Sequence, residues 1–113
     1  MTNELREPTF LVLTALAGGR KHGYAIIAEA AAISSDRVQL KAGTLYAALE
    51  RLEADGLVAK AGEEVVEGRL RRYYELTDDG AGILADEAAR QLSNAKAATQ
   101  RLSARGIRVA VAL

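Results

Sequence analysis

Hydrophobic residues recur at helical spacing along much of the chain, most clearly near its middle. Between residues 44 and 55 the apolar side chains follow one another at steps of three and four, which places them on one stripe of an α-helix: Leu45, Ala48, Leu49 and Leu52. Thr44 is a suitable N-cap, and Gly56 supplies the left-handed residue at which helices often end. The pattern therefore predicts a helix over residues 44–55 that buries its leucine stripe in a core.

Two more helices are predicted upstream of this central helix. Residues 9–17 are apolar nearly all round and follow Pro8, which a first helical turn tolerates, so they predict a buried helix. Residues 22–33 again show apolar side chains at helical steps, and residues 38–40 alternate as in one short strand. Two helices and a connection, with a mixed polar face on the second, are the outline of a helix-turn-helix.

Two short runs after the central helix, residues 57–61 and 69–76, are separated by an acidic link over residues 62–68 and predict a β-hairpin. Side chains alternate between the two faces of a strand, so the residues of the second run divide into two sets. The face expected to meet the core holds Leu70, Arg72, Tyr74 and Leu76, and the other holds Arg69, Arg71, Tyr73 and Glu75. Arginines near the hairpin tip suit phosphates or a minor groove, although a solvated arginine face explains them equally well.

A long C-terminal helix is predicted from residue 78 to about 103, because Thr77 is a good N-cap and no proline follows. At 1.5 Å per residue it would span roughly 39 Å, more than so short a chain can cover. Residues at steps of three and four form a seam along one side of this helix, which suggests contact with a second copy of the chain: Leu84, Ala88, Leu92, Ala95, Thr99 and Leu102. The alternative is a lone helix that packs on its own domain. The tail over residues 107–113 alternates only weakly.

The composition limits the classes of function. The 113 residues suit one folded unit, and 15 basic residues balance 15 acidic ones, so no global positive field favours nucleic acid. Charge is nevertheless local, with one basic cluster at residues 20–22 and another at residues 69–72. There is no cysteine and no apolar run long enough to span a membrane, and we expect a soluble, cytoplasmic protein.

Chemistry that would indicate an enzyme is missing from the sequence. There is no phosphate-binding loop, no nucleophile elbow and no cluster of metal ligands, and His22 is the only histidine, so we expect no catalysis, metal or cofactor. The polar face of the central helix, with Thr44, Tyr46, Ala47 and Arg51, suits the DNA major groove, although a solvated face is the commoner explanation. His22 and Tyr24 open the preceding helix, where backbone amides attract phosphate.

Three segments together resemble the PadR family of bacterial transcription regulators. They are residues 22–26 (His-Gly-Tyr-Ala-Ile), residues 43–49 continuing to 52–58, and residues 71–77 with Gly80, in matching order and spacing. The resemblance covers about residues 5–85. Ala42, Ala47 and Leu70 stand where the family often has proline, which concerns the stiffness of these segments and the geometry of the wing.

The resemblance implies a mainly α fold with a small β-hairpin: a winged helix-turn-helix over residues 1–76, then a dimerisation helix and tail over residues 77–113. It implies a homodimeric repressor, on a palindromic operator, in which the long helix packs with the partner's first helix through residues such as Phe10 and Leu13. By the resemblance, DNA contacts would come from the recognition element, the preceding helix and the wing: Lys41, Thr44, Tyr46, Tyr24, Arg69, Arg71 and Arg72. The polar face of the central helix adds Ala47 and Arg51 as candidates, and the start of the preceding helix adds His22. A small-molecule effector would bind at or near the dimer interface.

A different class of function remains open at this point. The neutral net charge and the acidic link suit a winged-helix module that binds another protein and has no affinity for DNA.

Overall fold

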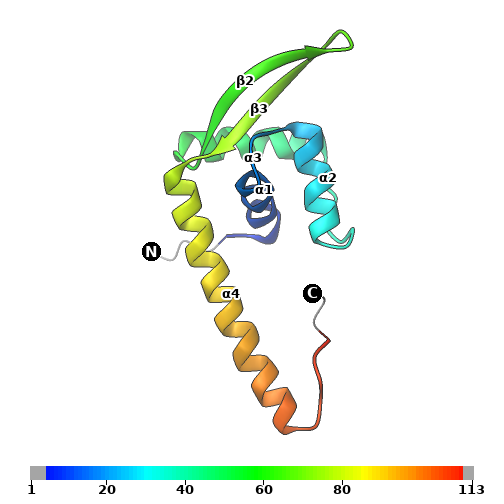
Figure 1. Ribbon diagram of the computed structural model, residues 1–113, viewed down its shortest axis with the longest axis vertical. Coiled ribbons are helices and arrows are strands. Elements are labelled where there is room, and N and C mark those ends of the chain that lie inside the picture. Colours follow the sequence, from blue (N-terminus) through cyan, green and yellow to red (C-terminus); the bar gives the residue numbers. More distant parts are fainter. Residues whose placement is uncertain (1–4, 111–113) are drawn as a thin grey trace.

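Residues 5–110, the part of the chain that the computed structural model describes, form four helices and one three-stranded antiparallel sheet (Figure 1). In chain order the elements are α1 (Glu7–Ala17), β1 (Lys21–His22), α2 (Gly23–Ile33), α3 (Ala42–Ala54), β2 (Val58–Val66), β3 (Arg69–Leu76) and α4 (Asp78–Ala104). The strands lie in the order β1-β3-β2. The expected fold class is confirmed, a winged helix-turn-helix followed by a long terminal helix.

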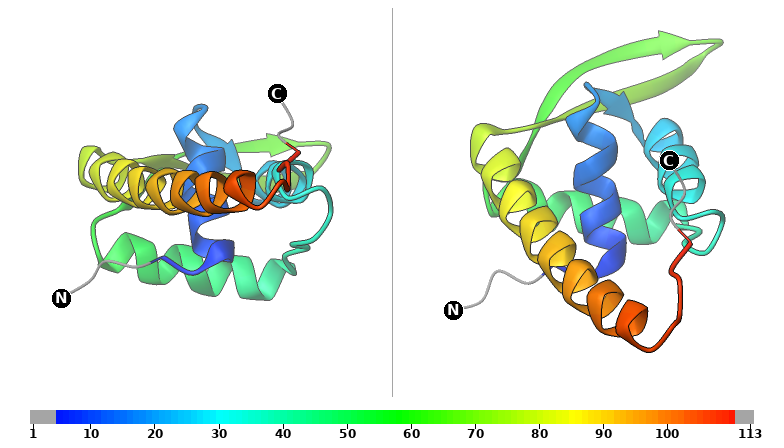
Figure 2. Two further views of the ribbon diagram at one scale, coloured as in Figure 1. Left: turned by 90° about the horizontal axis from the view of Figure 1, so that it is seen from below. Right: turned by 60° about the horizontal axis from the view of Figure 1, so that its bottom comes forward.

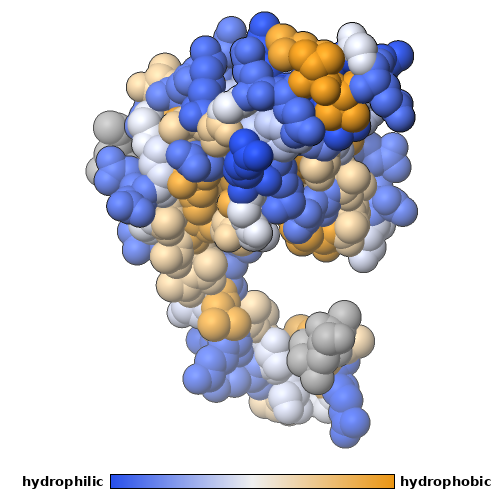
Figure 3. Space-filling view, turned by 45° about the horizontal axis from the view of Figure 1, so that its top comes forward, coloured by the Kyte–Doolittle hydropathy of each residue, from blue (hydrophilic) through white to orange (hydrophobic). Residues whose placement is uncertain are grey.

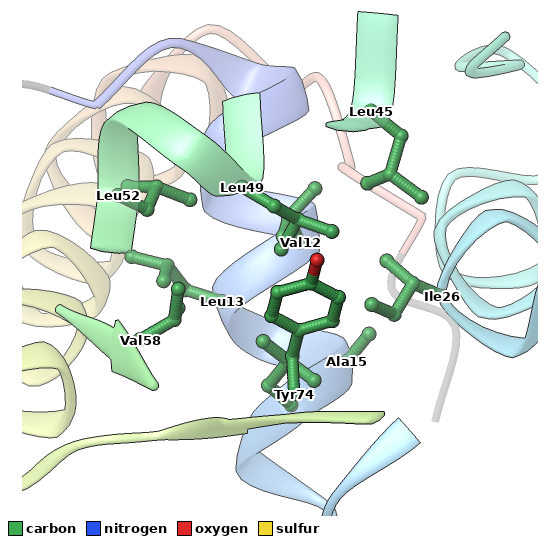
Figure 4. Close-up of a cluster of buried hydrophobic side chains, with 10 residues drawn as sticks. Val12, Leu13, Ala15, Ile26, Leu45, Leu49, Leu52, Val58 and Tyr74 are labelled. Atoms are coloured by element: carbon green, nitrogen blue, oxygen red, sulfur yellow. The ribbon is translucent and has the colours of Figure 1, made fainter. Parts of the chain in front are cut away.

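The core forms where α3, α2 and the sheet pack around α1, which lies between the other helices (Figure 2). The predicted leucine stripe of α3 is confirmed, because Leu45 and Leu49 have no exposed surface and Leu52 is 5% exposed. These side chains face residues from α1, α2 and the strands (Figure 4): Val12, Leu13, Ala15, Ile26, Val58 and Tyr74. Burying each large apolar side chain contributes about 1.5–3 kcal/mol, so this packing determines how α3 is oriented.

Tyr74 is the one aromatic side chain in this core, and its hydroxyl points toward α3 (Figure 4). Burial raises the pKa of Tyr74 above 10.0, and the neighbouring Tyr46 and Glu53 raise it further. The phenol therefore stays neutral at physiological pH and behaves as part of the core.

The start of α3 corrects two expectations. The helix begins at Ala42 with Lys41 as its N-cap, so Thr44 lies in the first turn and does not cap. The short strand expected over residues 38–40 is not formed, and the third strand of the sheet is β1 instead. Leu40 instead packs against the core as part of an irregular connection.

The hairpin of β2 and β3, called the wing from here on, is longer than the sequence suggested. The predicted acidic link is mostly strand, since β2 continues to Val66 and only Glu67 and Gly68 form the turn. Both turn residues have positive φ, 52° and 77°, as a two-residue type I′ hairpin turn requires. The outer wing extends past the helices (Figure 1), so both of its faces meet solvent.

This overhang corrects the predicted core face of β3. Tyr74 is buried and Leu76 half-buried as expected, but Leu70 is 52% exposed and Arg72 is exposed. The alternation of side chains is as predicted, but the core ends before it reaches Arg72 and Leu70.

A tight joint connects the wing to α4. The Thr77 side chain accepts a hydrogen bond from the Gly80 amide (3.0 Å) and donates one to the Gly56 carbonyl (2.7 Å), which confirms Thr77 as the N-cap. The Thr77 amide also donates to the Leu57 carbonyl, at 3.1 Å. Gly80 is buried so closely against Leu57 that an added Cβ would lie 3.0 Å from its carbonyl carbon and still closer to its oxygen. The first turn of α4 is thus locked to the start of β2.

The helix α4 has 27 residues, about 40 Å at 1.5 Å per residue; its first turns pack against α1, and its C-terminal half extends away from the rest of the molecule (Figure 1). No helix within residues 5–110 combines the length and apolarity needed to cross a membrane. Four of the residues expected to contact a partner are exposed on α4: Ala88, Leu92, Ala95 and Thr99. Leu92, at 73% exposed, is the largest apolar side chain among them.

The other predicted interface residues are placed differently. Leu84 packs against the core of its own protomer, and Leu102 is half-buried near the turn where the Ile107 amide donates to its carbonyl. Phe10 is half-buried. Leu13 has no exposed surface, so the expectation that it contacts a partner is corrected: it points from α1 into the core that α3 and β2 cover.

Glu87 is a buried charge that the sequence pattern did not single out. Its carboxylate accepts hydrogen bonds from the Leu5 amide at 3.0 Å and from Arg90 at 3.1 Å, which ties the start of the chain to α4. The backbone hydrogen bond from Leu5, followed by that from Arg90, lowers the pKa of Glu87 below 4.5. The ionised form is therefore the one that the fold stabilises.

Replacing Gly80 with alanine should destabilise the fold, because the new methyl group overlaps the Leu57 carbonyl, which cannot move without shifting β2. We expect a loss of about 1–3 kcal/mol in the free energy of unfolding, measured by urea denaturation. Gly82 is the matched control: it lies in the same helix with nothing near its Cβ position, so Gly82→Ala should stabilise by up to about 1 kcal/mol. Equal effects of the two substitutions would contradict the tight joint.

Glu87 should make stability depend on acid. Because its pKa is lowered in the folded state, its contribution is present above the unfolded value of 4.5 and is lost as the pH falls below it. We expect Glu87→Gln to lower the melting temperature at pH 7 and to weaken its dependence on pH below 4.5. A variant whose melting temperature falls with acid as steeply as that of the unmodified protein would refute this role.

Candidate nucleic-acid interface

Six of the ten predicted DNA-contacting residues line a single cleft between the wing, the start of α2 and one side of α3. The cleft has a volume of about 500 Å³, and the six are His22, Tyr24, Tyr46, Arg69, Arg71 and Arg72. They come from segments up to 50 residues apart, and the fold brings them together because β1 joins the start of α2 to β3. Tyr24 is 78% exposed and Tyr46 is 42% exposed, so both rings are accessible.

Gly23 permits the close approach of α2 and α3 in this cleft. A Cβ at Gly23 would lie 3.0 Å from Cζ of Tyr46 and even closer to the hydroxyl oxygen. The ring of Tyr46 therefore leans over the first turn of α2. The local pattern gives no sign of this role for Gly23, because its contact is with a residue 23 positions away.

His22 caps α2, as its place at the start of the helix predicted. Its Nδ1 accepts a hydrogen bond from the Ala25 amide at 3.4 Å, and its ring lies edge-on to Tyr73 with centroids 5.6 Å apart. Both contacts are internal to the protein. A contact of His22 with phosphate stays a prediction.

The other side of α3 borders a second groove, of about 480 Å³, between α3 and the start of α1. Thr44, Ala47 and Arg51 line this groove together with residues of α1 and its N-cap: Arg6, Pro8 and Thr9. Thr44 and Tyr46 thus lie on opposite flanks of α3, since residues two apart in a helix do not share a face. The exposed face of α3 lies between the two clefts, opposite the leucine stripe.

Charge is distributed unevenly on the wing. Cross-strand pairing sets Glu63 opposite Arg72 and Glu64 opposite Arg71, and Arg72 Nε lies 3.8 Å from a Glu63 carboxylate oxygen. Within residues 5–110, no acidic side chain is in salt-bridge contact with Arg69 or Arg71. These two guanidinium groups, both exposed, are the ones free to meet an external anion.

The end of the wing is apolar as well as basic. Val65 and Leu70 are cross-strand neighbours, 69% and 52% exposed, and they form a hydrophobic patch among hydrophilic side chains (Figure 3). Lys41, at the N-cap of α3, is exposed too.

Two members of the basic cluster at residues 20–22 bond to backbone carbonyls of the protein itself. The Lys21 ammonium donates to the Ala15 carbonyl at 2.7 Å and lies 3.8 Å from Glu29, and its side chain is only 17% exposed. The Arg20 guanidinium donates to the Ala61 carbonyl at 2.7 Å. Neighbouring charges in the sequence are here committed to internal contacts, which a pattern of charges does not reveal.

Comparison with known proteins agrees with this architecture. The chain matches the model of the transcriptional regulator PadR-like family over residues 12–86. It belongs to that family. The match includes α2, α3 and the wing together, as well as the first turns of α4, so the resemblance found in the sequence is confirmed over most of the described fold.

Solved structures of PadR-like proteins share the fold. A PadR family transcription regulator from Clostridium difficile is 28% identical, with a TM-score of 0.70 over 86% of this chain and 99% of the other. PadR of Bacillus subtilis, in complex with operator DNA, superimposes with a TM-score of 0.63 at 23% identity, over 72% of this chain and 46% of the other. At that identity the second likeness shows the fold alone.

Among related sequences, a transcriptional regulator of Mycobacterium tuberculosis is 42% identical over 55 residues. That match spans 49% of this chain and 50% of the relative. The PadR-like chain therefore aligns with about half the length of this relative, and the family comprises transcriptional regulators rather than enzymes.

Proposed function

We propose that this PadR-like protein is a sequence-specific DNA-binding repressor that acts as a homodimer and leaves its operator when a small molecule binds. The main support is that Tyr46 of α3 lines one cleft together with the exposed wing arginines Arg69 and Arg71, while the rest of the exposed face of α3 lies beside that cleft. The DNA complex of the Bacillus subtilis relative, which has the same fold, adds weight.

The division of labour follows from side-chain chemistry. An α-helix fits the width of the major groove, and the first turns of α3 hold the hydroxyl of Thr44 and the charge of Lys41 where base edges would be reached. Arg69 and Arg71 extend from the wing to meet DNA phosphates. Such contacts position the protein on the duplex but do not read the base sequence. Affinity then depends on salt, and sequence choice depends on α3.

A homodimer would cover surface that one chain leaves open. The exposed seam of α4 presents Leu92 with small residues on either side of it, which lets a second helix approach closely. Two-fold symmetry would then place two copies of α3 on the half-sites of a palindromic operator.

An effector site fits the same region. A cleft of about 370 Å³ lies between α1, α2 and α4, and its walls include the apolar side chains of Leu5, Phe10, Leu11 and Ile33. A ligand there would touch both the helix that carries the dimer seam and the helices that support α3. Binding of a ligand in this cleft would therefore change the spacing between the two copies of α3 in the dimer.

Substitutions should separate phosphate contacts from base contacts. Arg71→Ala is expected to weaken binding to every duplex and to lower the slope of log K against log salt, by about 0.9 for each phosphate that the protein no longer neutralises. Thr44→Val keeps the shape of the side chain and removes the hydroxyl, so it should weaken operator binding by about 1–3 kcal/mol while leaving random duplex unaffected. Tyr46→Ala should likewise harm operator binding more than non-specific binding. Fluorescence anisotropy over a series of salt concentrations measures both effects.

The duplex for this test is the region upstream of the protein's own gene, with a scrambled sequence as control. Equal losses on both duplexes for Thr44→Val would contradict base reading by α3. If the unmodified protein shows no salt-sensitive binding at low ionic strength, the alternative of a protein-binding module is favoured. The paired charges of the wing and the zero net charge of the chain support that alternative.

The α4 seam can be tested by charge. Leu92→Glu is expected to convert a dimer to a monomer at micromolar concentration, because two carboxylates would be buried side by side without partners. Asn94→Glu, about 200° further round the same exposed helix, is the control and should leave the dimer intact. Sedimentation velocity distinguishes the two states, and a dimer that survives Leu92→Glu would rule out this seam.

A further inference from the structure

Arg20 joins the connection between α1 and α2 to both strands of the wing. Its Nη1 donates to the Ala61 carbonyl of β2 at 2.7 Å, and its guanidinium carbon lies 4.5 Å from the ring centroid of Tyr73 in β3. A hydrogen bond from a charged donor and a cation–π contact are both stronger than ordinary surface contacts. One side chain thus bridges three segments.

Ala61 lies at the point where the wing is irregular. The pairing of β2 with β3 shifts register between Lys60 and Glu63, which marks a β-bulge, and Gly62 within it has a φ of 105°. A bulge bends its strand and leaves backbone groups without ladder partners. Arg20 donates to the carbonyl of Ala61 within this bulge, and it packs so near that a Cβ on Gly62 would lie 3.2 Å from its Nη1.

Tyr73 extends the contact outward along the wing. Its hydroxyl donates to a Glu64 carboxylate oxygen at 2.9 Å, and its ring meets the edge of His22. The ring is therefore held from three sides, by Arg20, His22 and Glu64. Beyond it lie Arg71 and Arg69 on the same face of β3, at the period of two.

The base of this arrangement is fixed to the helices. Lys21, next to Arg20, pairs with Tyr74 in the sheet, and its ammonium donates to the Ala15 carbonyl at the end of α1. Arg20 therefore projects from a backbone that is anchored to α1 and can hold the wing relative to the helical core.

We propose that Arg20 is a positioning residue, a latch that sets the angle of the wing relative to α3 and so places Arg69 and Arg71 for phosphate contact. This rests on the proposed DNA-binding function. In this proposal Arg20 acts through the wing, because its Nη1 donates to the Ala61 carbonyl and its guanidinium lies over the Tyr73 ring. Without the latch, the bulge is free to flex and the wing arginines are no longer preorganised.

The latch can be tested first without DNA. Hydrogen exchange of the wing amides over residues 60–73 should accelerate in Arg20→Ala, which loses both contacts. It should accelerate in Arg20→Lys as well, because lysine keeps the charge but lacks the planar guanidinium that can donate a hydrogen bond and stack on a ring at the same time. Tyr73→Phe retains the ring and loses only the Glu64 bond, so its exchange should rise less. Unchanged exchange in Arg20→Ala would overturn the proposal, whether or not the protein binds DNA.

Binding to the upstream duplex then separates a latch from a phosphate contact. Arg20→Ala should weaken binding by about 10-fold, the loss of one charged hydrogen bond, with no change in the salt slope. Arg20→Lys should bind the upstream duplex as weakly as Arg20→Ala does. A slope lowered by about 0.9 per site, or affinity restored by lysine, would show that Arg20 touches phosphate and would overturn the latch.

Arg101→Ala is the matched control for the loss of one positive charge, since Arg101 is exposed on the distal part of α4. It should alter neither wing exchange nor the salt slope. If exchange responds as expected while the unmodified protein ignores DNA, the latch stands and the proposed function fails.

Discussion

The packing of the α3 leucine stripe against α1 and Tyr74 is the constraint on which the rest of the structure depends. Leu45, Leu49 and Leu52 leave one rotational setting for α3, because any other would expose them to water. The face with Thr44, Ala47 and Arg51 is exposed for the same reason that the leucines are buried. The positions of both clefts beside α3 follow from this one orientation of the helix.

The joint at Thr77 makes the winged helix-turn-helix and the long helix one mechanical unit. Its hydrogen bonds and the close fit of Gly80 leave no flexible linker between β3 and α4, and Glu87 ties the start of the chain to the same helix. A change in how two copies of α4 cross would therefore be transmitted to α3 and the wing as a rotation. In the proposed dimer, this coupling would connect the interface to α3 and the wing.

Neutral total charge is compatible with a local anion-binding surface because many charges are paired within the molecule. Lys21 caps α1, Arg72 faces Glu63, and Arg37 pairs with Glu7. A few guanidinium groups, such as Arg69 and Arg71, remain exposed at the wing. Their number is small, so in the proposed complex with DNA the direction in which the wing points would decide how many phosphates they reach.

The sequence by itself determined the helices, their buried faces, the hairpin and the family, because periodicity, caps and turn residues act between neighbours in the chain. Only the tertiary structure decided what depends on distant partners: the pairing of β1, the depth of Leu13, the close fit of Gly80, and where the core ends beneath β3. The contacts of Arg20 with Ala61 and of Leu5 with Glu87 join residues 41 and 82 positions apart. Such contacts leave no periodic trace, because they arise from packing of elements whose mutual placement the local pattern does not encode.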